Sequence, residues 1–103
     1  MNWIVKGMKF NNSEIYFEMD YGLANLSLKA KEDDENFYVF PDEFIHALRH
    51  RHSIGHYESN FIMESMCYED QMNCVIIFGD SRVVLYDKEI EFIIAHLEYL
   101  LGN

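Results

Sequence analysis

The side chains best suited to chemistry in this sequence lie in the segment HALRHRHSIGH, residues 46–56. Its four histidines are His46, His50, His52 and His56. The first two are four residues apart, so on a helix they would share one face, as in a two-histidine transition-metal site. Two arginines lie among these ligands, and their positive charge opposes a bound cation. The sequence therefore favours another interpretation, in which this basic segment complements the negative end of a helix dipole, and no metal site is predicted.

The chain shows no motif of nucleophilic or phosphate chemistry. It contains no Gly-x-Ser-x-Gly turn, no phosphate-binding glycine loop and no His-Glu-x-x-His pattern. Residues 32–36, EDDEN, lack the spaced ligands and the distal glutamate of an EF-hand loop, so calcium is not predicted. We therefore predict no catalytic residue and no cofactor, and we expect a protein that is not an enzyme.

The two cysteines, Cys67 and Cys74, are too few for the disulfide framework of a small secreted domain. Their spacing fits a hairpin with its tip at residues 69–72, which would place the two thiols opposite each other on adjacent strands. A cross-strand disulfide is conceivable in that geometry, but two reduced, apolar thiols are the favoured state.

Negative charge is concentrated in a few stretches of the chain. The sequence has 18 acidic and 8 basic residues and a net charge of -10. Residues 31–40, KEDDENFYVF, place four carboxylates in a row before an aromatic run, and no Lys or Arg occurs between Arg51 and Arg82. Such a field repels nucleic-acid phosphates and anionic lipids, and it favours encounter with positively charged proteins. The alternative is that acidity serves solubility alone.

Tyrosines adjoin the acidic stretches, and a tyrosine beside carboxylates is typical of a surface that binds a basic protein. The ring supplies rigid contact area, and the carboxylate pairs with Lys or Arg. The predicted partner-binding residues form two segments, the first with Glu32, Asp33, Asp34, Glu35 and Tyr38, and the second with Tyr68, Glu69 and Asp70. Each tyrosine also fits the alternative of an ordinary amphipathic strand residue.

Alternation of apolar and polar residues predicts strands. The clearest is 14–20, in which Ile15, Phe17 and Met19 alternate with acidic and tyrosine side chains. Further strands are predicted over residues 3–10, 23–31, 37–40, 61–68, 72–78 and 82–86.

Two segments carry helix signals. Pro41, followed by two acidic residues, predicts the start of a helix over 41–50. Asp87 is the predicted N-cap of a helix over 88–101, whose aliphatic stripe ends before Gly102. The order of strand, acidic helix start and aliphatic stripe occurs in both halves of the chain.

These elements predict a single α+β domain over residues 1–103. We expect two layers, with an antiparallel sheet of about six or seven strands and two helices packed on one face. The first ten residues lack a continuous apolar segment, and no run reaches the 18 or so apolar residues that span a membrane. A cytoplasmic protein is therefore expected.

In its size, acidity, α+β layout and lack of catalytic motifs, the chain resembles the small immunity proteins that bacteria co-produce with polymorphic or contact-dependent growth-inhibition toxins. The residues that carry this resemblance are the two acidic, tyrosine-containing segments given above. The resemblance implies an antitoxin that binds a cognate toxin, often a nuclease, and occludes its basic surface. A runner-up function is a structural or adaptor domain that self-associates through a sheet edge or an exposed apolar surface.

Overall fold

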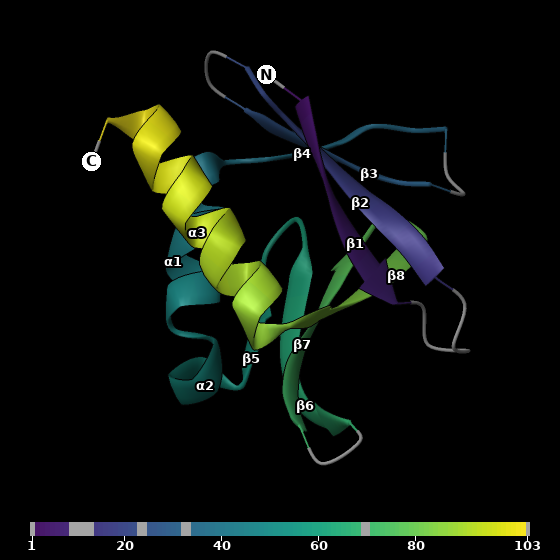
Figure 1. Ribbon diagram of the computed structural model, residues 1–103, viewed down its shortest axis with the longest axis vertical. Coiled ribbons are helices and arrows are strands. Elements are labelled where there is room, and N and C mark those ends of the chain that lie inside the picture. The colour runs from purple at the N-terminus through teal and green to yellow at the C-terminus, as the bar shows by residue number, and fades with distance from the viewer. Residues whose placement is uncertain (1, 9–13, 23–24, 32–33, 69–70, 103) are drawn as a thin grey trace.

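Figure 1 shows the computed structural model of the protein, which describes residues 2–8, 14–22, 25–31, 34–68 and 71–102. The strands are β1 (Asn2–Met8), β2 (Glu14–Tyr21), β3 (Leu26–Ala30), β4 (Phe37–Val39), β5 (His56–Glu58), β6 (Ile62–Tyr68), β7 (Gln71–Phe78) and β8 (Ser81–Tyr86). The helices are α1 (Pro41–Arg49), α2 (Arg51–Ile54) and α3 (Asp87–Leu101). Among the described residues, α1 thus follows a first group of four strands and α3 follows a second group of four.

The strands lie in the order β4-β3-β2-β1-β8-β7-β6-β5, and neighbouring strands are antiparallel. Pairing is extensive within β1–β4 and within β5–β8. In the described part of the chain, the two groups meet at one register pair, Met8 opposite Val84. Among the described residues the strands thus form two four-stranded halves that meet at this pair, which differs from the single sheet of about six or seven strands expected from the sequence.

The two halves curl toward each other and share one hydrophobic core. The ring of Phe78 in β7 lies 5.5 Å from that of Phe17 in β2 and 6.0 Å from that of Phe37 in β4, measured between centroids. At the outer strands, the side-chain amide of Asn60 donates a hydrogen bond of 2.8 Å to the carbonyl oxygen of Tyr38. These contacts hold together strands that are far apart in the strand order.

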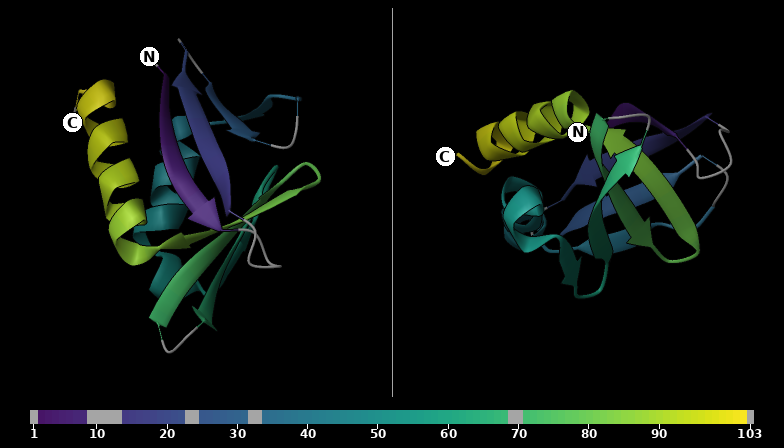
Figure 2. Two further views of the ribbon diagram at one scale, coloured as in Figure 1. Left: turned by 45° about the vertical axis from the view of Figure 1, so that its right-hand side comes forward. Right: turned by 90° about the horizontal axis from the view of Figure 1, so that it is seen from below.

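Helices α1 and α3 lie side by side against the curled strands (Figures 1 and 2). Pro41 occupies the first turn of α1, where its missing N–H costs no hydrogen bond. The buried face of α1 consists of Phe44, Ile45, Ala47 and Leu48. That of α3 consists of Ile90, Ile93, Ile94 and Leu97, and the helix ends at Gly102, whose φ is 79°. Only glycine adopts this left-handed conformation without steric cost, so the predicted end of the helix is confirmed.

The predicted α+β class is confirmed, and the counts of elements are corrected, since the described residues contain eight strands and three helices. Sequence reasoning missed β5 and α2, because segments of three and four residues are too short to show a periodic pattern. The predicted N-cap at Asp87 is wrong. The N-cap is Tyr86, whose backbone N–H donates a hydrogen bond of 2.8 Å to Glu89 Oε1.

Candidate functional site

The first predicted acidic segment lies between β3 and β4. Glu32 and Asp33 are outside the described residues. Asp34 and Glu35 are exposed, and Tyr38 in β4 is 56% exposed. Asn36, which follows the two described carboxylates, lines a hollow on the neighbouring strands. The described part of this segment therefore adjoins a concave surface that the sequence did not indicate.

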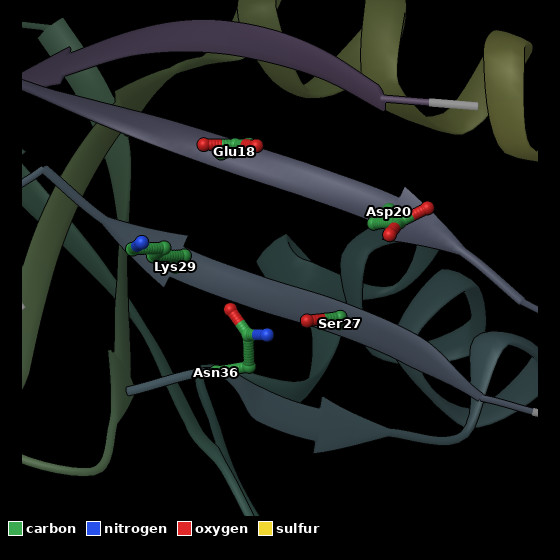
Figure 3. Close-up of a pocket in the computed structure, with 5 residues that line it drawn as sticks. All are labelled: Glu18, Asp20, Ser27, Lys29 and Asn36. Atoms are coloured by element: carbon green, nitrogen blue, oxygen red, sulfur yellow. The ribbon is translucent and has the colours of Figure 1, made fainter. Parts of the chain in front are cut away.

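The hollow has a volume of about 210 Å³. Its lining residues are Glu18 and Asp20 from β2, Ser27 and Lys29 from β3, and Asn36 (Figure 3). Strand register brings them together, since Glu18 is opposite Lys29 and Asp20 is opposite Ser27. Residues directly opposite each other in an antiparallel pair project to the same face of the sheet.

Tyr38 belongs to the same surface because the β3–β4 register places it opposite Ser27. We define the acidic face as the set Glu18, Asp20, Asp34, Glu35 and Tyr38. Four carboxylates thus accompany one exposed aromatic ring, while Lys29 contributes a positive charge inside the hollow. The acidic face is negative overall and has an aromatic residue at its margin.

The second predicted segment lies in the other half of the molecule. Tyr68 ends β6, and Glu69 and Asp70 are outside the described residues. The end of β6 and the end of β3 that leads toward Asp34 lie at different ends of the molecule (Figures 1 and 2). The fold therefore does not bring Tyr68 to the acidic face.

The four histidines of residues 46–56 do not converge on one site. The rings of His46 and His50 lie 4.7 Å apart at the end of α1. His52 Nε2 is 3.2 Å from Asp87 Oδ1, and His56 Nδ1 is 3.3 Å from Glu64 Oε1. Within the part of the chain that the structure describes, no three or more His, Cys, Asp or Glu side chains gather where they could hold a metal ion.

Arg51 is a structural feature that sequence reasoning missed, since we expected it on a solvated helix end. It is 5% exposed, and its guanidinium donates to Asp87 Oδ1 at 3.1 Å, to Glu91 Oε1 at 2.9 Å and to the carbonyl oxygen of Leu48 at 2.7 Å. Burial alone would lower the pKa of Arg51, but its hydrogen bonds to Glu91 and Asp87 outweigh that effect and raise the pKa. This cation joins α2 to α3 and serves the fold.

Both cysteines are free thiols, and their predicted placement is corrected. Cys67 lies opposite Met72 and Cys74 lies opposite Ser65, so the two are not cross-strand partners. The expected hairpin tip was displaced, because β7 already begins at Gln71. Cys67 is exposed, whereas Cys74 is buried and desolvation raises its pKa to about 12.

The two thiols should therefore differ sharply in reactivity. At pH 8 a group with a pKa of about 12 is ionised in roughly one molecule in ten thousand, and burial also blocks access to it. We expect iodoacetamide to modify Cys67 within minutes and Cys74 only after the protein is unfolded in urea. Peptide mass spectrometry of samples taken over time measures the rate at which each cysteine is modified. Equal rates for the two cysteines in the native protein would contradict the buried position of Cys74.

No helix in the described ranges combines the length and the apolar character that crossing a membrane requires. Comparisons of the chain with protein-family models, with curated proteins and with solved structures gave no match.

Proposed function

We propose that the protein is an immunity protein, an antitoxin that binds a cognate bacterial toxin domain and blocks it by covering a basic surface. The observation that supports this proposal is the acidic face, where strand register sets carboxylates of β2 beside the β3–β4 connection and an exposed tyrosine. A concave, negative surface with an aromatic anchor complements a convex, basic one.

Inhibition would be stoichiometric occlusion. A nuclease attracts its substrate through positive charges that meet phosphates, and carboxylates presented at the same spacing compete for those charges. Tyr38 would supply rigid apolar area to the contact, since its ring is already more than half exposed and loses little conformational freedom on binding. Inhibition by occlusion would need no catalytic group.

The acidic face alone carries this proposal. Of the second predicted segment, Glu69 and Asp70 lie outside the described residues, and Tyr68 ends β6, which is not a strand of the acidic face. We therefore propose that the contact with the toxin is centred on β2, β3 and β4.

The decisive experiment uses the toxin domain encoded next to the gene of this protein. We expect a one-to-one complex in calorimetry, with an affinity that falls steeply as salt is raised from about 50 to 500 mM. Neutralising the acidic face should lower the association rate at least about tenfold. The variant carries Glu18→Gln, Asp20→Asn, Asp34→Asn and Glu35→Gln.

A matched control removes four charges from exposed positions elsewhere on the molecule. It carries Asp42→Asn, Glu58→Gln, Glu64→Gln and Asp80→Asn. The net charge changes equally in both variants. A lower association rate in the first variant alone would therefore assign binding to the acidic face. An equal decrease of the association rate in both variants would show that only the overall charge matters. If no complex forms with the unmodified protein, the antitoxin proposal is wrong.

The runner-up, a self-associating adaptor, is favoured by one observation on α3. Phe92 is 54% exposed and Tyr99 is 78% exposed, and residues seven apart lie on the same side of a helix. Sedimentation of the free protein distinguishes the two functions. A monomer at all concentrations fits an inhibitor without its target, whereas a dimer that Phe92→Ser and Tyr99→Ser abolish would favour the adaptor.

A further inference from the structure

We infer that His46 and His50 at the end of α1 form a two-ligand site for a divalent transition-metal ion that prefers imidazole, with Zn²⁺ as the reference ion. The site is a property of this chain alone and does not depend on the proposed antitoxin function. In the part of the chain that the structure describes, no third His, Cys, Asp or Glu joins the pair, so water would fill the remaining coordination positions.

The two histidines are held one helical turn apart. His46 lies in the last turn of α1 and His50 is its C-cap, and the backbone N–H of His50 donates to the carbonyl oxygen of His46 at 3.1 Å. The buried face of the helix fixes Phe44, Ala47 and Leu48 in the core, whereas both histidines are exposed. Ligands that a rigid element already holds in place lose little conformational freedom when an ion binds.

The separation of the two rings suits one shared ion. A zinc ion lies about 2.0–2.1 Å from an imidazole nitrogen, and so about 3.2 Å from the centroid of that ring. Two imidazoles bound at about 90–110° to each other on one ion then have centroids about 4.5–5.2 Å apart. The centroids of His46 and His50 are 4.7 Å apart, so a shared ion requires no change in the helix.

Both rings are available as ligands. Among the described residues, the ring nitrogens of His46 and His50 take part in no hydrogen bond or ion pair, and the two rings contact each other. His52 and His56 differ, because each already faces a carboxylate. Neutral imidazole is a preferred ligand of zinc, nickel and copper ions, so the free pair is the part of this segment suited to them.

Arg49 and Arg51 were the reason to expect no metal in this segment from the sequence, because their positive charges oppose a cation. In the fold, carboxylates of α3 compensate both charges. Arg49 pairs with Glu98, and the buried Arg51 pairs with Asp87 and Glu91. The repulsion expected from the sequence is therefore largely removed, while the net charge of -10 attracts cations to the protein.

The probe for this site is ZnCl₂, titrated into the untagged protein in calorimetry and followed in parallel by the imidazole resonances in NMR spectra. We expect saturable binding of one ion per chain, with the largest shifts in the rings of His46 and His50. CuCl₂ should bind more tightly than ZnCl₂, because imidazole ligands follow the Irving–Williams order. MgCl₂ should bind at least about tenfold more weakly, because magnesium prefers oxygen ligands.

The variants His46→Gln and His50→Gln should each weaken zinc binding at least about tenfold, because a single imidazole cannot chelate the ion. Both positions are exposed, so we expect the variants to fold, and circular dichroism checks this. The matched control carries His52→Gln and His56→Gln. It removes two histidines from the same segment and should bind zinc as the unmodified protein does.

Zinc binding that persists when His46 and His50 are both replaced, or that falls equally in the control, would overturn the site. Binding that MgCl₂ matches would assign the ion to the carboxylates of the surface and would also reject the histidine pair. Neither outcome bears on the antitoxin proposal, because His46 and His50 are not part of the acidic face.

Discussion

Replacing Asp87 by Asn and Glu91 by Gln together is expected to lower the free energy of unfolding by about 3 kcal/mol or more. The reason is an asymmetry in burial. The Arg51 side chain is 6% exposed, whereas those of its two carboxylate partners are 44% and 67% exposed. Removing both negative charges leaves a cation buried without compensation, and the remaining hydrogen bond to the carbonyl oxygen of Leu48 does not neutralise it.

The substitution Arg51→Met should lower the free energy of unfolding by less than this double variant does, although it breaks the same ion pairs. It removes the buried charge and leaves the two carboxylates in contact with water, where they are solvated. Urea denaturation followed by circular dichroism measures all variants. The control is Glu98→Gln, which breaks the ion pair between Glu98 of α3 and Arg49 of α1 and should cost less than about 1 kcal/mol of unfolding free energy. If Arg51→Met lowers the free energy of unfolding as much as the double variant, or more, this account of the ion pairs is wrong.

Long elements with regular patterns were predictable from the sequence. In β2, alternation identified Phe17 and Met19 as buried, and both are fully buried. In α1 and α3 the apolar stripe and the terminal signals fixed the bounds of each helix to within one residue. The pairing of β1 with β8 was not predictable, because it joins segments that are distant in the sequence and leaves no local pattern.

The candidate site was predictable only in part. The exposure of Asp34, Glu35 and Tyr38 agrees with their polar and loop-like context. The hollow depends on the register that sets Asp20 opposite Ser27, and two strands that alternate correctly pair in many registers. The burial of Arg51 was equally hidden, because its partners on α3 are more than 30 residues away in the chain.

The substitution Phe78→Ala is expected to cost about 3–5 kcal/mol of unfolding free energy. Phe78 is buried near the end of β7, and its ring contacts Phe17 and Phe37 from the other half of the strands. Truncation would create a cavity between the two halves of the strands, where the Phe78 ring packs against β2 and β4. The stability of a domain of this size is about 5–15 kcal/mol, so the loss would be a large fraction of the total.

Phe92→Ala is the matched control, because it removes the same ring from a half-exposed position on α3 and should change stability by less than about 1 kcal/mol. The unfolding of Phe78→Ala should remain a single transition, because the residues that surround the cavity belong to one core. Fluorescence and circular dichroism should therefore change together as the protein unfolds. Two separate transitions would mean that the halves fold independently. A loss no greater than that of Phe92→Ala would mean that the aromatic contacts between β2, β4 and β7 contribute little, and that the two helices alone hold the halves together.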